Sequence, residues 1–418
     1  MPHTHDRIPQ THPIAARGRM NRQPEVVIAG AGPVGLTAAL LLGHKGISVA
    51  LLEAEAALSQ ELRASTFHPP TLDMLAPCGI TARMIEAGVV SPVWQIRLHP
   101  SGERAVFDLA ALNGETEHPY RLQCEQAKYC QFVLAEIEKL PGVTAHFSTA
   151  VTGLEQSDDA VRVEAASPGG EQAFAAAYVI GADGARSAVR RAAGIEMSGD
   201  VYPETTILAT TRFPFHEKLE GLSNVSYCWK PDGTFSLLRL PGVWRVSLYA
   251  RDGQTVDQAL SDAGQQDLLH DIVPEAGRIE VLETRPYRIH RRIASAYRSG
   301  RVFLAGDAAH LNSPSGGMGM NGGIHDAFSL CEKLIAVLQN GADPRTLDRY
   351  ERQRRPIAAD EIIQQAHRNR SRMQERDPDR RREILADLQR TTADPVRLKA
   401  YLMKSSMIEG LRRAAATP

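Results

Sequence analysis

The sequence predicts an α/β protein in which a Rossmann-like domain carries an inserted antiparallel sheet and ends in a C-terminal helical segment. Three observations support this fold class. A strand, helix and strand stand in order near the N-terminus, strands separated by hairpin turns fill the middle of the chain, and helical periodicity dominates after residue 343. Such changes of hydrophobic period indicate changes of architecture along a chain.

The N-terminal pattern is a βαβ unit. Val26–Ala29 is a short apolar run typical of a buried strand, and Val34–Leu42 is an apolar helix that glycines end. Ser48–Leu52 follows as the next strand, so the two strands should lie parallel. The same domain is expected to hold helices around Thr71–Ala76 and Glu125–Leu140, and strands at Thr144–Phe147, Val161–Glu164 and Ala173–Ile180.

The middle of the chain changes to short strands joined by tight turns. Strands are predicted at Ile207–Phe213, Val225–Trp229, Phe235–Leu240 and Val243–Tyr249. Pro231-Asp232-Gly233 and Pro241-Gly242 are hairpin signals between them. Val302–Ala305 then returns to a buried parallel-type strand, and a helix with one apolar face follows from Ile324 to Leu338. The antiparallel sheet is therefore inserted into the first domain.

This organisation divides the chain into four parts. We expect a disordered leader over residues 1–22, which lack an apolar segment. The nucleotide-binding domain is expected over residues 23–88, 113–200 and 290–345, and the inserted substrate domain over residues 89–112 and 201–289. The C-terminal helical segment covers residues 346–418.

Composition narrows the function classes. A chain of 418 residues can bury two hydrophobic cores, and its net charge of −1 gives no field that would attract nucleic acid. Its five cysteines form no Cys-x-x-Cys pair, which favours free thiols in a reducing compartment over disulfides or a metal site. No apolar run approaches the roughly 20 residues of a membrane span. We therefore expect a cytoplasmic protein with no metal, no membrane span and no nucleic-acid partner.

The first glycine-rich turn has the residues that a dinucleotide requires. In Gly30-Ala31-Gly32-Pro33-Val34-Gly35 the first glycine permits the tight turn. Gly32 lets the backbone approach a pyrophosphate, and Gly35 lets the helix pack closely on the strand. Glu53 ends the next strand, where a carboxylate accepts hydrogen bonds from a ribose without a 2′-phosphate. The turn thus predicts FAD or NAD.

A second turn favours FAD. Gly306-Asp307 follows the strand Val302–Ala305, and the glycines of residues 316–323 lead into a helix. Asp307 can meet a ligand hydroxyl, while the start of the helix offers backbone N–H groups to an anionic group. Two such turns, far apart in the sequence, suit the two ends of one extended cofactor. Read alone, Asp307 also fits a simple helix cap and the glycines a flexible loop, but the first glycine-rich turn favours the cofactor interpretation.

The motifs resemble the three signatures of class A flavoprotein aromatic hydroxylases, the para-hydroxybenzoate-hydroxylase-like group. The resemblance runs from Val26 to Ala358. It rests on Gly30–Gly35, on Asp183-Gly184-x-Arg186-Ser187-x-x-Arg190, on Gly306-Asp307-Ala308-Ala309-His310 with Pro314, Gly317, Met320, Asn321 and Asp326, and on Tyr350-Glu351-Arg352-Gln353-Arg354-Arg355-Pro356. Ser313 stands where the group usually has a second proline, and Gln353 where glutamate is frequent. We expect these departures to alter local fit rather than the reaction class.

The resemblance implies non-covalently bound FAD and a role for each matching residue. Glu53 would bind the adenosine ribose, Val151 the adenine side, and Arg63 and Gln126 the phosphates and the ribityl region. Asp307 would hold the ribityl or pyrophosphate part, backbone groups at Gly319–Asn321 the pyrimidine edge, and Asp183 and Arg186 both FAD and the transient nicotinamide. The full expected set is Gly30, Gly32, Pro33, Val34, Gly35, Glu53, Ala54, Arg63, Gln126, Val151, Asp183, Arg186, Gly306, Asp307, Pro314, Gly317, Gly319, Met320 and Asn321.

The implied reaction uses NADH or NADPH to reduce FAD, and O2 to hydroxylate a small electron-rich aromatic ring. No catalytic base follows from the sequence. Candidates for the flavin and substrate side are Pro314, His310, Tyr227 and Arg239. Each has an ordinary structural reading as well, because a lone loop histidine is usually a hydrogen-bonding group and strand aromatics are usually core.

The sequence argues against some other functions and leaves others as alternatives. A halogenase should show Trp-x-Trp, whereas Trp94, Trp229 and Trp244 lie far apart. A disulfide reductase needs a redox cysteine pair, and an ordinary NAD dehydrogenase leaves Gly306-Asp307 unexplained. Epoxidation, oxidative decarboxylation and non-catalytic flavin binding remain alternatives. The substrate and the choice of NADH or NADPH are undetermined, and a homodimer is one assembly open to the chain.

Overall fold

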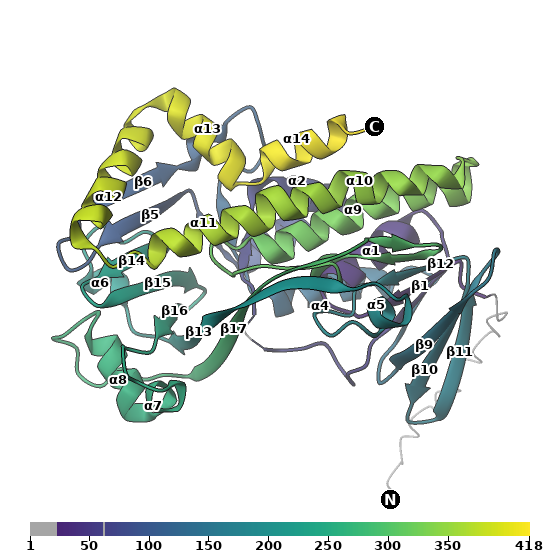
Figure 1. Cartoon of the computed structure of the whole chain (residues 1–418), viewed down its shortest axis with the longest axis horizontal. Coiled ribbons are helices and arrows are strands. Elements are labelled where there is room, and N and C mark those ends of the chain that lie inside the picture. The colour runs from purple at the N-terminus through teal and green to yellow at the C-terminus, as the bar shows by residue number, and fades with distance from the viewer. Residues whose placement is uncertain (1–22, 62) are drawn as a thin grey trace, which may run out of the picture.

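The computed structural model describes residues 23–61 and 63–418. The leader expected over residues 1–22 lies outside the described residues. A six-stranded sheet and an eight-stranded sheet lie toward opposite ends of the elongated molecule, and long helices run beside both (Figure 1). The predicted α/β class, with an antiparallel sheet inserted into a nucleotide-binding fold, is confirmed.

The six-stranded sheet forms the nucleotide-binding end, in the order β18-β19-β12-β1-β2-β8. Strand β1 pairs in parallel with both β2 and β12, and β19 joins β12 in parallel, so the chain returns to this sheet after the insertion. The strands are β1 (Val26–Ala29), β2 (Val49–Leu52), β8 (Val143–His146), β12 (Tyr178–Gly181), β18 (Arg298–Ser299) and β19 (Val302–Leu304).

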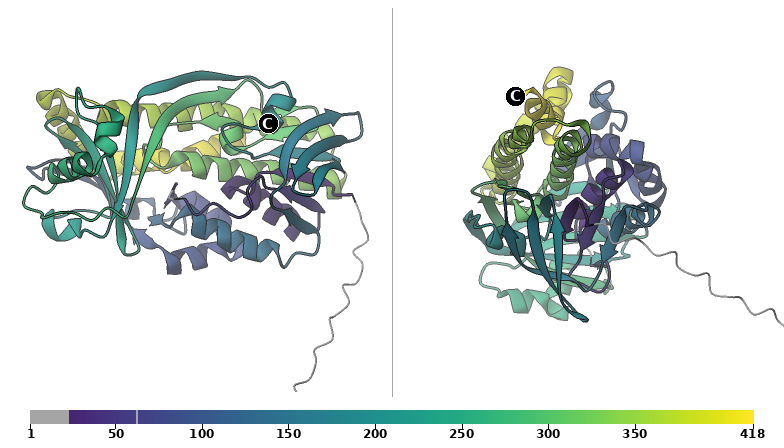
Figure 2. Two further views of the ribbon diagram at one scale, coloured as in Figure 1. Left: turned by 90° about the horizontal axis from the view of Figure 1, so that it is seen from below. Right: turned by 90° about the vertical axis from the view of Figure 1, so that its right-hand side faces the viewer.

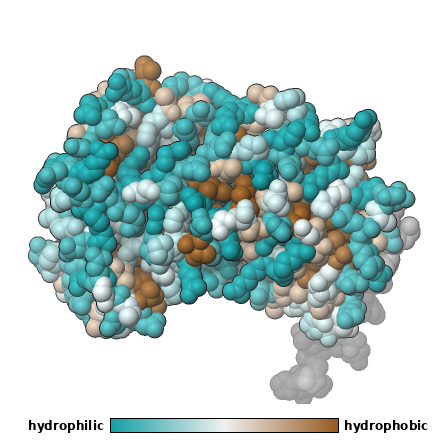
Figure 3. All heavy atoms as spheres, viewed as in Figure 1, coloured by the Kyte–Doolittle hydropathy of each residue, from teal (hydrophilic) through white to brown (hydrophobic). Residues whose placement is uncertain are grey.

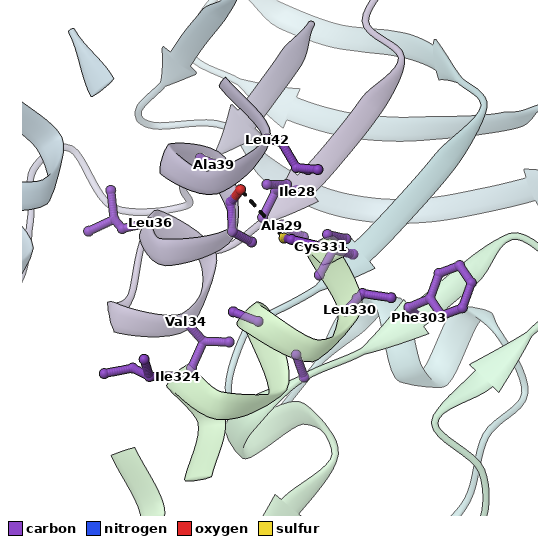
Figure 4. Close-up of a cluster of buried hydrophobic side chains, with 14 of the residues drawn as sticks. Ile28, Ala29, Val34, Leu36, Ala39, Leu42, Phe303, Ile324, Leu330 and Cys331 are labelled. Carbon is purple, nitrogen blue, oxygen red and sulfur yellow. Dashed lines mark hydrogen bonds between the residues drawn. The ribbon is translucent and has the colours of Figure 1, made fainter. Parts of the chain in front are cut away.

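Helices α1 (Pro33–His44) and α9 (Met318–Asn340) pack beside this sheet and against each other. Figure 4 shows Leu36 and Ala39 of α1 in one cluster with Ile28 of β1 and Leu330 of α9. The apolar faces of strand and helix are wholly buried there, which is the main stabilisation available to a βαβ unit. α4 (Gln126–Ile137) and α5 (Ala188–Ala192) belong to the same end of the molecule.

The eight-stranded sheet has the order β20-β17-β13-β16-β15-β14-β5-β6. Its two longest strands, β13 and β17, run from the nucleotide-binding end into the inserted sheet (Figure 2). β17 also pairs with β20, which directly follows the Gly306-Asp307 turn. The strands are β5 (Val93–Leu98), β6 (Arg104–Asp108), β13 (Met197–Thr211), β14 (Val225–Lys230), β15 (Gly233–Leu240), β16 (Val243–Tyr249), β17 (Glu283–Ala294) and β20 (His310–Leu311).

Two three-stranded sheets complete the strand arrangement. The first is β9 (Ala150–Gln156), β10 (Val161–Ser167) and β11 (Gly170–Ala176), and the second is β3 (Thr66–Phe67), β4 (Val89–Ser91) and β7 (Arg121–Gln123). The single strand expected over Ala173–Ile180 is wrong, because β11 and β12 belong to different sheets. Backbone bonds from Ala177 and Tyr178 to Glu25 mark the point where the chain changes sheet.

Short helices connect these sheets. They are α2 (Pro69–Leu75), α3 (Ile80–Ala87), α6 (Phe215–Lys218), α7 (Val256–Leu260) and α8 (Asp262–His270), with 3-10 turns at Ala76–Cys78, Leu109–Leu112, Gly306–Ala308 and Pro344–Leu347. All five cysteines are free. Within the described ranges, no three or more histidine, cysteine or acidic side chains form a group that could hold a metal ion. Among those same residues, no helix has both the length and the apolar character to cross a bilayer.

The C-terminal segment is helical, as predicted. Its helices are α10 (Asp348–Ile357), a π-helical turn at Ala358–Ile363, α11 (Gln364–Met373), α12 (Pro378–Ala393), α13 (Pro395–Ser405) and α14 (Ile408–Ala416). α12 packs against β6, and Trp229 of β14 donates through Nε1 to the Arg372 carbonyl at 3.1 Å. This segment therefore returns to the inserted sheet. Mostly hydrophilic residues, with smaller hydrophobic patches, cover the face of the molecule seen in Figure 3.

A buried carboxylate joins three parts of the fold. Asp326 of α9 accepts a hydrogen bond from the Gly306 N–H at 3.2 Å and pairs with His310 Nε2 at 2.8 Å through the same oxygen. Its other oxygen pairs with Arg354 Nε of α10 at 2.7 Å. Burial opposes ionisation, but Arg354 and His310 lower the pKa of Asp326 overall. The ionised carboxylate thus fixes the Gly306-Asp307 turn to both helices.

Replacing Arg354 by methionine should destabilise the protein by about 3–5 kcal/mol, because the Asp326 carboxylate would stay buried without its strongest partner. Chemical denaturation measures the change. Arg380→Met is the control, since Arg380 and Glu383 form an exposed ion pair whose loss should change little. A loss in Arg354→Met no larger than in this control would contradict the role given to Asp326.

Candidate functional site

The turn between β1 and α1 is shaped by glycines that have different surroundings. A Cβ on Gly30, whose φ is +98°, would lie 2.5 Å from the Ala182 carbonyl oxygen, and a Cβ on Gly35 would lie 1.9 Å from the Gly30 oxygen. A Cβ on Gly32 would have no atom of the described chain within 4 Å. Gly30 and Gly35 thus serve packing, whereas the backbone at Gly32 is open to a ligand beside the unpaired N–H groups that begin α1.

Glu53 at the end of β2 holds this turn. Its Oε2 accepts from the Ala31 N–H at 2.6 Å, and its Oε1 accepts from the Glu55 N–H at 2.9 Å. Each carboxylate oxygen has a second lone pair, so these bonds leave acceptor capacity for a ribose hydroxyl. The neighbouring Ala54 is exposed.

The second turn touches the first. A Cβ on Gly306 would lie 2.7 Å from Val34 Cγ2, and a Cβ on Gly323 would lie 2.6 Å from the same atom and 2.9 Å from the Gly306 Cα. Gly306 has a φ of +61°, which glycine adopts without strain. Only glycine at both positions allows α9 and the Gly306-Asp307 turn to approach the start of α1 this closely. The two motifs therefore meet at one end of the six-stranded sheet.

The third motif is tied to both. Asp183 caps α5, because its Oδ2 accepts from the N–H groups of Ala188 at 2.7 Å and Val189 at 3.1 Å. Arg190 donates through Nη1 to the Ala308 carbonyl at 2.9 Å, which links α5 to the Gly306-Asp307 turn. Arg186 is exposed. Asp183 Oδ2 and the Arg190 guanidinium thus contact the protein, whereas Asp183 Oδ1 is buried without a hydrogen-bond partner among the described residues. Arg186 is the member of the motif that faces solvent.

Asp307 is exposed, whereas Ala308 and His310 beside it are buried. Surrounding protein nevertheless raises the pKa of the Asp307 carboxyl by limiting its hydration, against the lowering effect of His310, Arg63 and His290. Arg63, which is exposed and pairs with Glu61 at 2.8 Å, therefore lies on the same side of the molecule as Asp307.

The start of α9 is fixed by Asn321. Its Nδ2 donates to the carbonyls of Thr66 at 2.8 Å and Gly317 at 2.7 Å, and its Oδ1 accepts from the His68 N–H at 3.0 Å. The His68 ring is bonded to the Gly316 carbonyl at 2.8 Å. The Asn321 side chain is thus occupied by the protein, and the backbone N–H groups of the first turn of α9 are left to face a ligand.

The other residues expected at the site have mixed positions. Gln126 begins α4, Val151 lies in β9, and both are half-buried, whereas Pro314 is exposed in the turn before α9. Pro33 is the first residue of α1, and Gly317, Gly319 and Met320 form the N-terminal turn of α9. His310 is fully buried against Asp326. Arg239 lies over the Trp244 ring at 5.9 Å and, unlike Tyr227, does not line the cavity described next.

A small cavity of about 30 Å³ opens beside the turn that precedes α9. That turn contributes Ser315 and Gly316. Strand residues contribute Trp94, Ile96, Arg121 and Tyr227. The C-terminal helices contribute Asn369, Arg372, Met373, Tyr401 and Ser405. The cavity therefore lies where the start of α9, the inserted sheet and the C-terminal segment meet.

The sequence analysis named Tyr227 as a candidate for the substrate side but did not identify most of the other residues that line this cavity. Arg121 stands in β7, a strand of three residues that is too short to give a periodic signal. Arg372 and Tyr401 lie on helices whose amphipathic pattern predicts helix but does not reveal what each face contacts. Only the tertiary structure brings these residues together.

Comparisons with known proteins agree with this geometry. Residues 23–366 match the family described as FAD binding domain. The chain is 34% identical over 394 residues to para-nitrophenol 4-monooxygenase of Pseudomonas sp. (strain WBC-3), covering 93% of this chain and 96% of the relative. It is 32% identical over 337 residues to 6-hydroxy-3-succinoylpyridine 3-monooxygenase HspB of Pseudomonas putida (strain DSM 28022 / S16), covering 80% and 85%.

The structure is also similar to a solved one. The crystal structure of p-nitrophenol 4-monooxygenase PnpA from Pseudomonas putida DLL-E4 matches with a TM-score of 0.87 and 32% identity, covering 94% of this chain and 99% of that one. These findings confirm the resemblance to aromatic hydroxylases that the motifs indicated. The chain therefore belongs to the FAD binding domain family, among flavoproteins similar to aromatic monooxygenases.

Proposed function

We propose that this protein is an FAD-dependent monooxygenase that uses NADH or NADPH and O2 to hydroxylate a small phenolic or heteroaromatic compound. One observation carries the proposal. Gly306 and Gly323 pack against Val34, so both nucleotide-binding turns lie together, and a cavity lined by aromatic side chains adjoins the second turn. A cofactor gripped by both turns would thus have its reactive end beside a space for substrate.

The residues present fit FAD. The open backbone at Gly32 and the start of α1 would hold the pyrophosphate, because helix N-termini bind anions. Glu53 would accept from the adenosine ribose, and Asp307 and Arg63 would contact the ribityl and phosphate region. The first turn of α9 would donate to the pyrimidine edge. When bound, FAD supplies hydride acceptance from a nicotinamide and activation of O2 for transfer of one oxygen atom.

The cavity walls would orient the ring and keep out water. Trp94, Tyr227 and Tyr401 supply aromatic surface, and Ile96 and Met373 supply apolar surface. A bound aromatic ring held by such walls has few orientations, which lowers the entropy cost of reaction. The C-terminal helices would thus complete the active site rather than serve only as a structural tail.

His310 is assigned a positioning role. It is fully buried, bonds to Asp326, and stacks on Tyr297 with ring centroids 6.2 Å apart. Because Asp326 also accepts from the Gly306 N–H, His310 acts on the cofactor turn through that carboxylate. The domain boundaries, a homodimer, a cytoplasmic location and the choice of NADH or NADPH stay predictions.

Turnover is the first test. With FAD-loaded protein, oxidation of NADH or NADPH and consumption of O2 should rise sharply on adding one member of a panel of phenols and hydroxylated N-heteroaromatic acids. Mass spectrometry should find a product one oxygen atom heavier than that substrate. Protein that binds FAD but shows no stimulation with any panel member would favour the non-catalytic alternative.

Gly32→Val should abolish tight FAD binding without unfolding the protein. Gly32 has φ −74° and ψ −179°, which valine adopts readily, and its Cβ would meet no described atom within 4 Å. The added side chain would occupy the approach of the pyrophosphate, so we expect the Kd for FAD to rise at least about tenfold. Fluorescence titration with FAD and thermal unfolding measure the two effects.

Gly277→Val is the matched control for this variant. Gly277 also has open space around it but lies between α8 and β17, away from the turn. It should keep wild-type affinity for FAD. If Gly32→Val also kept wild-type affinity, the pyrophosphate would lie elsewhere.

Asp307→Ala should bind FAD poorly, because the substitution removes an exposed acceptor beside the two glycine-rich turns and takes nothing from the core. A loss of at least about tenfold in affinity is expected, since a hydrogen bond to a charged group is worth about 1.5–3 kcal/mol. Asp307→Asn should recover part of it. An Asp307→Ala protein that is fully yellow and active would remove Asp307 from the cofactor site.

A further inference from the structure

Arg121 is a buried cation that lines the cavity, and two of its nitrogen atoms have no hydrogen-bond partner among the described residues. The residue is 2% exposed, and neither Nε nor Nη1 has a hydrogen-bond partner within the described part of the chain. Its guanidinium carbon lies over the Trp94 ring, 4.6 Å from the centroid. Buried donors without partners are rare in folded proteins. Arg97 and Arg245 also carry such donors, but Arg121 differs from them because it lines the cavity.

The charge of the cavity points to the kind of ligand. Its wall carries two arginines, Arg121 and Arg372, and no aspartate or glutamate belongs to the lining set. Arg372 donates through Nη1 to the Tyr401 hydroxyl at 3.1 Å, so this partner is a hydroxyl group rather than a carboxylate. Without an anion, the guanidinium of Arg121 would stay buried and uncompensated, which is costly.

Nearby groups do not supply the missing anion. Burial and the charge of Arg121 lower the pKa of His68 to about 3, so His68 is neutral at physiological pH. Tyr227 lies within hydrogen-bonding reach of Arg121, and Tyr401 also interacts with its charge, but neither side chain is a carboxylate. Burial itself lowers the pKa of Arg121 but leaves the side chain protonated near neutral pH.

We propose that Arg121 binds an anionic oxygen of the aromatic substrate, so that the enzyme selects ring compounds carrying a phenolate or a carboxylate. This inference rests on the proposed function and names its substrate class. Trp94, Tyr227 and Tyr401 surround the ring, while Arg121 and the second cation Arg372 stabilise its charge. A phenolate held in this way is richer in electrons than the phenol, which suits attack on an electrophilic oxygen.

Ligand binding to the oxidised, FAD-loaded protein tests the proposal without turnover. The probes are two anion and neutral pairs, 4-nitrophenol at a pH where it is ionised with 4-nitroanisole, and benzoate with benzamide. Perturbation of the flavin absorbance gives each Kd. We expect the wild-type protein to bind at least one anion at least about tenfold more tightly than its neutral partner. The pair that shows the preference tells phenolate from carboxylate.

Arg121→Met should abolish this preference, because it should lower the affinity for the anion and leave the affinity for the neutral probe nearly unchanged. Arg121→Lys should keep part of the preference. Arg97→Met is the control, because Arg97 is another buried arginine, on β5, that does not line the cavity. It should keep the anion preference. An Arg121→Met protein that retains the wild-type preference would overturn the proposal.

The affinities of the wild-type protein for each anion and its neutral partner test the proposal even if a variant fails to fold. A wild-type protein that binds neither anion more tightly than its neutral partner would also overturn the proposal. If that protein still couples NAD(P)H oxidation to hydroxylation, only the substrate class proposed here fails. If it takes up no FAD at all, the proposed function itself fails.

Discussion

The close approach of two glycine-rich turns is the constraint on which the site depends. Gly306 and Gly323 have no side chains, so Val34 at the start of α1 can fill the space against both of them. Any larger residue at either position would push α9 away from the six-stranded sheet. The contact places the N-termini of two helices at one end of that sheet, where both favour negative charge. A long anionic cofactor with two separated polar ends is the ligand that this arrangement fits.

The same contact is reinforced by a buried ionic network. Asp326 accepts from the Gly306 N–H and pairs with His310 and Arg354, and all three side chains are almost fully buried. Burying charges is expensive, and such networks are often weak sources of stability. Here the network holds the Gly306-Asp307 turn to α9 and α10, and Asp307 alone of that turn is exposed. Precise placement of the turn is the benefit that offsets the desolvation.

Local signals in the sequence predicted the elements that carry the cofactor motifs. These elements depend on contacts within one βαβ unit, so a short stretch of sequence is enough to predict them. The stretch comprises the apolar runs Val26–Ala29 and Val34–Leu42 and the glycines between them. Features set by tertiary contact were missed or misread. β11 and β12 were merged because the change of sheet at Ala177 has no periodic signal. The side chain of Asn321 forms hydrogen bonds with Thr66, Gly317 and His68, which are far from it or give no signal in the sequence. Arg121 and Tyr401 line the same cavity only because the chain folds.

The central claim is that one FAD molecule spans both turns, and a crystal structure of the FAD complex tests it most directly. The account predicts the pyrophosphate within hydrogen-bonding distance, about 2.7–3.2 Å, of the backbone N–H groups of Gly32, Val34 or Gly35. It also predicts the pyrimidine edge of the flavin at the first turn of α9, facing the cavity that Arg121 lines. Density for FAD at only one of these turns, or with the ring directed away from that cavity, would contradict it.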